Sequence, residues 1–152
     1  MSDRVEIVRV EPQTTAVVRR RASMAELATA IPEMCGEAWD FASATPGLDP
    51  GRHLALYLND LMDIECGVEV ARPFEGNGRV VCSSTPAGTA ATVAHFGPYH
   101  MLPSVHDALA RWCADNGHEL AGPSWELYGH WDDDPAKLRT DVYYLLRDGG
   151  AS

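Results

Sequence analysis

The chain has 152 residues, of which 45% are hydrophobic and 22% charged, a composition typical of a soluble globular protein. This length favours a single domain, and no apolar run approaches the ~18 residues that a membrane-spanning helix requires. The net charge of −10 and the single basic run, Arg19–Arg21, argue against direct contact with nucleic acid. The first residues lack the apolar core of a signal peptide, so we expect a cytoplasmic protein.

The cysteines and histidines do not have the spacing of a metal site. Four cysteines stand at positions 35, 66, 82 and 113 without a CxxC pair, and the six histidines form no HExxH motif. Cys35 and Cys113 lie within apolar helical patterns, which favours buried thiols over disulfides. We therefore expect no bound metal and no cofactor.

The first half of the chain is predicted to contain four strands, at residues 5–10, 14–20, 53–59 and 64–70. Glu11-Pro12-Gln13 joins the first two, which predicts a hairpin. Ser23 and Glu26 have the spacing of a capping box, and Pro32 suits the first turn of a longer helix. The buried stripe of that helix is expected to contain Met34, Cys35, Ala38 and either Phe41 or Ala42.

The second half is predicted to repeat this order, with strands at residues 78–83, 89–96, 124–131 and 140–147. Residues 85–88 join the first two strands and again predict a hairpin. A helix is expected at about residues 102–116, ended by Gly117, which tolerates the left-handed conformation. Its apolar stripe consists of Leu102, Val105, Leu109, Trp112 and Cys113.

The two halves also share short sequences. Leu56-Tyr57 resembles Leu127-Tyr128, and aligning these pairs sets Ala55 opposite Glu126. A carboxylate that only one half carries suggests a functional role more than a structural one.

These patterns predict one α+β domain over residues 1–152, with pseudo-repeats at about 4–71 and 77–147. Each half reads strand, strand, helix, strand, strand, and the sheet is expected to be mainly antiparallel. We expect two helices on one face of the sheet and a ligand cleft between the halves, because ligand sites favour such junctions.

The strand that contains Glu126 alternates between two faces. Period two places Trp125, Leu127 and Trp131 on one face and Ser124, Glu126, Tyr128 and His130 on the other. Leu54, Leu56 and Leu58 form a similar apolar face in the first half. We expect the helices to cover the apolar faces, which leaves Glu126, Tyr128 and Tyr57 on the uncovered side. A carboxylate among aromatic rings must be paired, protonated or available to a cation, whereas the alternative is a solvated strand position.

Four segments resemble the gyrase-inhibitor-like (GyrI-like) small-molecule-binding domain, also called the bacterial transcription activator effector-binding domain. They are Glu11-Pro12 with residues 14–18, His95-Phe96-Gly97-Pro98-Tyr99, Trp112 with Gly117, and Gly122-Pro123 with Glu126-Leu127-Tyr128 and residues 140–144. The resemblance spans nearly the whole chain. It implies a duplicated fold in which a buried glutamate, here Glu126, and a cage of aromatic rings accept bulky aromatic cations.

The resemblance also implies which aromatic residues contact a ligand. The aromatic wall would consist of Tyr57, Tyr99 and either Tyr143 or Tyr144, since strand alternation does not say which of the last two faces the ligand. Tyr128 and Trp39 are further candidates for ligand contact. The alternatives are that Tyr57 and Tyr128 are ordinary amphipathic sheet residues and that Tyr99 fixes a strand-to-helix corner.

The function that the resemblance implies is the binding of hydrophobic or aromatic, cationic small molecules by a sensor or drug-sequestering protein. Regulators of this family carry a DNA-binding segment ahead of the domain. Here the first strand begins at about residue 4, so we expect a stand-alone member, a monomer or homodimer without direct nucleic-acid contact.

Two other functions stay open. The first is a detoxifying hydrolase that opens cyclopropane rings of DNA-alkylating natural products, with Glu126 as general base and Tyr128 as a hydrogen-bond donor. Glu37, beside Trp39, is a weaker second acidic site for such chemistry. The other function is a protein-binding inhibitor of a topoisomerase.

Overall fold

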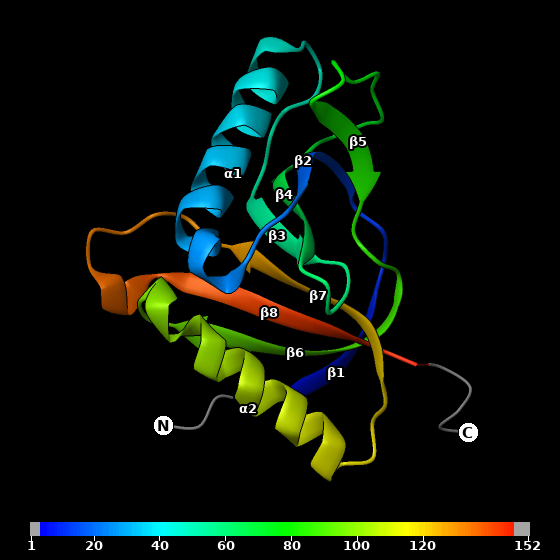
Figure 1. Ribbon diagram of the computed structural model, residues 1–152, viewed down its shortest axis with the longest axis vertical. Coiled ribbons are helices and arrows are strands. Elements are labelled where there is room, and N and C mark those ends of the chain that lie inside the picture. Colours follow the sequence, from blue (N-terminus) through cyan, green and yellow to red (C-terminus); the bar gives the residue numbers. More distant parts are fainter. Residues whose placement is uncertain (1–3, 148–152) are drawn as a thin grey trace. The chain divides into compact units, whose positions relative to one another are not determined.

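The computed structural model describes residues 4–147, which form eight strands and two α-helices (Figure 1). The strands are β1 (Glu6–Val10), β2 (Thr14–Arg21), β3 (His53–Tyr57), β4 (Asp63–Glu69), β5 (Val80–Ser84), β6 (Gly88–Phe96), β7 (Leu120–Tyr128) and β8 (Arg139–Leu146). The helices are α1 (Leu27–Ala44) and α2 (Leu102–Asp115), with short 3-10 helices η1 (Met24–Glu26), η2 (Tyr99–Met101) and η3 (Pro135–Lys137). The predicted α+β class and the eight predicted strands are confirmed.

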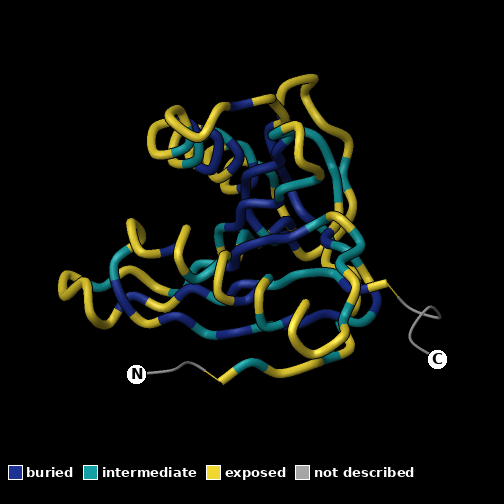
Figure 2. The backbone as a smooth tube through the Cα atoms, turned by 60° about the horizontal axis from the view of Figure 1, so that its bottom comes forward, coloured by how far each residue is buried: buried dark blue, intermediate teal, exposed yellow. Residues whose placement is uncertain are grey.

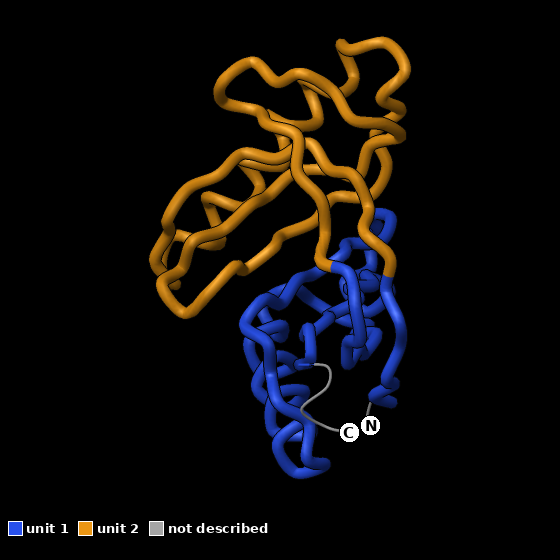
Figure 3. The backbone as a smooth tube through the Cα atoms, turned by 90° about the vertical axis from the view of Figure 1, so that its right-hand side faces the viewer, with its two compact units in different colours: residues 1–10, 87–152 blue, residues 11–86 orange. Residues whose placement is uncertain are grey.

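The chain divides into two compact units, coloured in Figure 3. Unit 1 consists of residues 1–10 and 87–152, and unit 2 of residues 11–86. In unit 1 the strands follow the order β1-β6-β8-β7, and in unit 2 the order β3-β4-β2-β5, with antiparallel pairing within each unit. In both units, buried positions run along the strands and helices, while the loops are mostly exposed (Figure 2).

Both predicted hairpins are wrong. β1 pairs with β6 instead of β2, and β5 pairs with β2 instead of β6, so each half of the sequence gives its first strand to the other unit. The loop Glu11-Pro12-Gln13 contains no glycine to adopt the left-handed conformation that a short hairpin loop usually needs. Gly88, the last residue of the other predicted loop, does have a positive φ, but it begins β6, which pairs with β1 and β8. Instead, Gln13 N donates to Thr85 Oγ1 at 2.9 Å and Thr85 N donates to Gln13 O at 3.0 Å, which extends the β2–β5 ladder.

Helix α1 begins earlier than predicted. The Ser23–Glu26 capping box is present, but it precedes η1 and a helix that starts at Leu27, so Pro32 lies inside the helix. Proline lacks the N–H that would bond the Ala28 carbonyl, a cost that packing of the helix offsets. The buried residues of α1 are Ala30, Met34, Cys35, Ala38 and Ala42.

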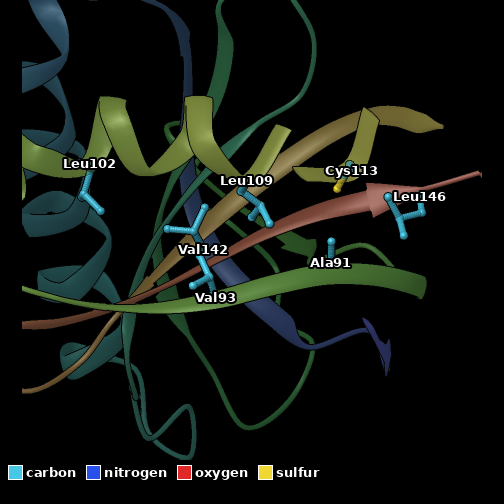
Figure 4. Close-up of a cluster of buried hydrophobic side chains, with 7 residues drawn as sticks. All are labelled: Ala91, Val93, Leu102, Leu109, Cys113, Val142 and Leu146. Carbon is cyan, nitrogen blue, oxygen red and sulfur yellow. The ribbon is translucent and has the colours of Figure 1, made fainter. Parts of the chain in front are cut away.

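Helix α2 and its sheet form the core of unit 1. Seven buried side chains from α2, β6 and β8 pack together: Ala91, Val93, Leu102, Leu109, Cys113, Val142 and Leu146 (Figure 4). Val105 and Trp112 pack against this cluster while partly exposed. The predicted apolar stripe of α2 is thus confirmed.

Two further sequence predictions concern the thiols and the basic run. All four cysteines are free, and Cys35, Cys66 and Cys113 are buried, as expected for core thiols. The exposed arginines of the basic run, Arg19–Arg21, pair with Glu65, Glu26 and Asp63. Among residues 4–147, no helix is long and apolar enough to cross a membrane.

Candidate functional site

The Glu126 side chain is buried in unit 1. Glu126 stands on β7 opposite Val142 of β8, and only 3% of its surface is exposed. This burial excludes the solvated strand position. A buried carboxylate costs free energy unless hydrogen bonds or charges compensate for its lost hydration.

Hydrogen bonds reach both carboxylate oxygens of Glu126. The Tyr128 hydroxyl donates to Oε1, and Nε2 of His106 lies 2.6 Å from Oε2. The other ring nitrogen of His106, Nδ1, lies 2.8 Å from the Tyr144 hydroxyl. Strands β7 and β8 and helix α2 thus contribute to one chain of hydrogen bonds, here called the Glu126 network: Tyr128, Glu126, His106 and Tyr144.

The chemistry of the carboxylate, the imidazole and the phenol determines which atoms of the Glu126 network donate hydrogen bonds and which accept them. When Glu126 is ionised its carboxylate only accepts hydrogen bonds, and Nε2 of His106 is then the donor to Oε2. In a neutral imidazole Nδ1 is then an acceptor, and the Tyr144 hydroxyl donates to it. Burial, with the negative charge of Asp107 adding to it, raises the pKa of Tyr144 to about 12, so this phenol keeps its proton at neutral pH.

Helix α2 covers the face that carries Glu126, contrary to the prediction that the helices cover the Trp125 and Leu127 side. α2 runs along β6 and β8 (Figure 1), and its His106 bonds Glu126 directly. Tyr128 and Tyr144 also pack against the α2 core. The prediction assumed that only apolar residues lie beneath a helix. Here α2 covers Glu126 because its own His106 provides a hydrogen-bond partner for the carboxylate.

This arrangement also separates the two tyrosines that the sequence left open. Tyr144 bonds His106 in the Glu126 network. Tyr143 stacks on Trp125, with ring centroids 5.1 Å apart and planes at 5°. Of the two, Tyr144 belongs to the Glu126 side.

Two more aromatic rings lead from the Glu126 network toward solvent. Tyr99 meets Tyr128 edge to face at 5.7 Å, and its centroid lies 6.5 Å from that of Trp131. Burial raises the pKa of Tyr99, while Trp131 is 71% exposed. β7 ends at Tyr128, so the prediction that Trp131 continues the apolar face of this strand is wrong.

Three other candidates belong to unit 2. Tyr57 ends β3 and is half-buried, and Trp39 of α1 stacks on His53 at 5.2 Å. Tyr57 and Trp39 stay predicted ligand residues. Glu37 forms a bidentate ion pair with Arg79, which lowers the pKa of Glu37 and neutralises this weaker acidic site.

Sequence reasoning missed His106, although the sequence contains a signal for it. His106 lies four residues after Leu102 and three before Leu109, which places it on the apolar stripe of α2. A titratable side chain on a buried helical stripe needs a polar partner inside the protein. That partner lies 20 residues further along the chain, on a strand.

Comparison with known proteins agrees with this architecture. Residues 3–147 match the sequence profile of the GyrI-like small molecule binding domain. The chain belongs to this family. A comparison with curated protein sequences gave no significant match.

Solved structures share the fold of this GyrI-like chain. The C-terminal domain of EcmrR aligns with a TM-score of 0.82 at 24% identity, over 97% of this chain and 99% of that domain. EcmrR in a complex with DNA aligns at 0.81 and 23% identity, over 95% of this chain and 57% of the EcmrR chain. SAV2435 bound to tetraphenylphosphonium aligns at 0.65 and 9% identity, over 97% and 95% of the two chains. A hydrolase from Listeria innocua aligns at 0.61 and 11% identity, over 94% and 91%.

Proposed function

We propose that this GyrI-like protein binds hydrophobic aromatic cations next to Glu126, as a sensor or as a protein that sequesters them. The observation that carries the proposal is the buried Glu126 carboxylate, whose two oxygens are fixed by Tyr128 and His106. A carboxylate held in a low-dielectric environment attracts a cation more strongly than one in water.

Aromatic rings support the same ligand class. Tyr128 and Tyr144 belong to the Glu126 network, and Tyr99 and Trp131 continue the rings toward solvent. A cation over an aromatic face gains ~0.5–2 kcal/mol, so several rings and one carboxylate suffice for micromolar affinity. Membership of a small-molecule-binding family and the tetraphenylphosphonium complex of SAV2435 agree with this choice. Tyr57 and Trp39 stay proposed as further ligand contacts.

The test is a calorimetric titration with tetraphenylphosphonium of the wild type, Glu126→Gln and Glu119→Gln. Glu119 is a matched control, because its side chain is 71% exposed in the same unit and its replacement removes the same charge. We expect Glu126→Gln to weaken binding by about tenfold or more, since the buried negative charge is lost. Glu119→Gln should bind like the wild type. Equal affinity of Glu126→Gln and the wild type would exclude the role of the carboxylate.

The contact between Glu126 and Tyr128 also favours a second function, hydrolysis of a strained ring. Glu126 would take a proton from water, whose oxygen bonds a ring carbon as the ring bond breaks. The electrons of the broken ring bond would pass to a ligand oxygen, and the Tyr128 hydroxyl would turn from Glu126 to donate a hydrogen bond to that oxygen. Glu126 would then give the proton to the same oxygen, which returns the carboxylate to its starting state. Turnover of a cyclopropane-bearing alkylator, followed by mass spectrometry and lost in Glu126→Gln, would establish this function. If the alkylator is unchanged after prolonged incubation, the hydrolase function is excluded and only the binding function stands.

A further inference from the structure

We propose that binding of a cation beside Glu126 releases a proton from His106, so that His106 makes the affinity for cations depend on pH. This inference rests on the proposed function and concerns the same site. In this proposal, the protonation of His106 determines the pH range in which the site binds a cation tightly.

His106 and Glu126 form a close and buried pair. Nε2 of His106 and Oε2 of Glu126 are 2.6 Å apart, and the two side chains are only 16% and 4% exposed. At this separation and burial, solvent screens the two groups weakly. A positive charge on His106 therefore repels a cation that binds beside Glu126, whereas a neutral His106 does not.

The Tyr144 hydroxyl can form a hydrogen bond with both the neutral and the protonated form of His106. When His106 is neutral, the Tyr144 hydroxyl donates to Nδ1, which lies 2.8 Å away. When His106 is protonated, Nδ1 becomes a donor, and the phenol oxygen accepts after rotation of its O–H bond. Neither state leaves Nδ1 without a partner, so His106 can gain or lose its proton without disrupting the Glu126 network.

Other titratable groups lie in and next to the Glu126 network. They are Glu126 and Tyr128 on β7, Tyr144 on β8, Asp107 and Cys113 on α2, and the buried His95 on β6. Burial raises the pKa of Tyr144 to about 12 and also raises that of Cys113, so both stay neutral at physiological pH. A cationic ligand beside Glu126 adds a positive charge near His106 and therefore opposes a proton on His106.

A cation that binds beside Glu126 must compete with a proton on His106, because both carry a positive charge. The dissociation constant should therefore rise as the pH falls, by up to about tenfold per pH unit when one proton is released per cation bound.

The experiment is a calorimetric titration with tetraphenylphosphonium from pH 5 to pH 8, in buffers of different ionisation enthalpy. The wild type should release up to about one proton per cation, because binding and protonation are linked. His106→Gln keeps an N–H donor for Glu126 but does not titrate, so its affinity should hardly change with pH. His118→Gln is the matched control: His118 stacks on Trp112 at 5.6 Å, outside the Glu126 network, and this variant should keep the wild-type pH dependence. His95→Gln should also keep it.

The outcomes separate this inference from the proposed function. If the wild type binds the cation with a constant affinity and no proton release, the inference is wrong and the proposed function stands. If His106→Gln keeps the wild-type slope, the proton comes from another group, Glu126 included, and the inference is again overturned. If the wild type binds no cation at any pH, both proposals fail. If His106→Gln does not fold, NMR of the wild-type histidine rings with and without tetraphenylphosphonium decides the question, since only loss of the proton from His106 itself agrees with the inference.

Discussion

The buried polar side chains of unit 1 differ in how their hydrogen bonds are satisfied. Glu126 and His106 form short bonds to each other and to two phenols. Nearby, Nε2 of His95 and Oγ1 of Thr140 are buried without a hydrogen-bond partner among residues 4–147. His95 and Thr140 face each other across β6 and β8. An unsatisfied buried polar group costs about 1–3 kcal/mol, so this pair reduces the stability of unit 1.

Thr140→Val should therefore leave the free energy of unfolding within about 0.5 kcal/mol of the wild type, or increase it, because the lost hydroxyl makes no bond. Thr92 on β6 gives the contrast, since its hydroxyl donates to the Val142 carbonyl at 2.9 Å. Thr92→Val should lower the free energy of unfolding by about 1 kcal/mol. Urea denaturation of both variants measures the difference. A larger loss for Thr140→Val than for Thr92→Val would show that the Thr140 hydroxyl does form a hydrogen bond in the folded protein.

Among single residues, the sequence predicted the role of Glu126 better than that of the other members of the Glu126 network. Glu126 stood out because a carboxylate alternates with aromatic residues along one strand. His106 could not be paired with it from sequence, since their contact depends on how α2 lies on β7 and β8. Likewise, alternation placed Tyr143 and Tyr144 on opposite faces but did not say which face α2 covers.

At the scale of elements, local signals located the strands and misassigned their partners. Glu11-Pro12-Gln13 and Thr85-Pro86-Ala87-Gly88 look like hairpin loops because they are short and contain proline. Partner choice depends instead on ladders between strands that are far apart in sequence, such as β1 with β6. A sequence pattern of period two predicts which residues of a strand share a face, but it does not say with which other strand that strand pairs.

The β2–β4 ladder depends on a glycine. Gly67 of β4 stands opposite Val17, and a Cβ at this position would overlap the Ala16 carbonyl oxygen and lie 2.8 Å from Val17 Cα. Both obstacles are backbone, so they cannot move without breaking the ladder. Gly67→Ala should therefore lower the melting temperature by well over the ~4 °C that about 1 kcal/mol represents in a domain of this size.

Gly36 provides the matched control for this substitution. It lies in α1, and nothing stands within 4 Å of a Cβ added there. Gly36→Ala should raise stability by roughly 0.5–1 kcal/mol, because alanine loses less backbone entropy in a helix. Thermal melts followed by circular dichroism compare the two variants. Similar melting temperatures for both would mean that β2 and β4 are not held as closely as the structure shows.

At the scale of the whole molecule, the α+β class and the order of elements followed from the sequence, because each element has its own period and its own end signals. The exchange of first strands between the two units did not follow, since it depends on contacts between distant segments. Burial of the thiols could be predicted in part, because Cys35 and Cys113 lie in apolar helical patterns. Burial raises the pKa of a thiol, and this shift affects the stability of the entire chain.

Stability should fall at alkaline pH because buried acids resist ionisation. Burial raises the pKa of Cys35 from 9.0 to about 12 and that of Tyr144 from 10.0 to about 12. In the unfolded chain both groups ionise at their ordinary pKa, so between pH 9 and 12 the unfolded state binds fewer protons than the folded state. Unfolding becomes more favourable as the pH rises through this window, by at most about 1.4 kcal/mol per pH unit for each group.

Cys35→Ala isolates the thiol part of this effect. Urea denaturation under reducing conditions at pH 8, 9, 10 and 11 should show that the free energy of unfolding of the wild type declines from about pH 9. The variant loses packing at every pH, so its curve should lie lower, but its decline should be shallower because one buried acid is missing. Cys82→Ala is the control, since Cys82 is only half-buried, and it should keep the wild-type slope. Parallel curves for the wild type and Cys35→Ala would show that the Cys35 thiol ionises as readily in the folded protein as in the unfolded chain.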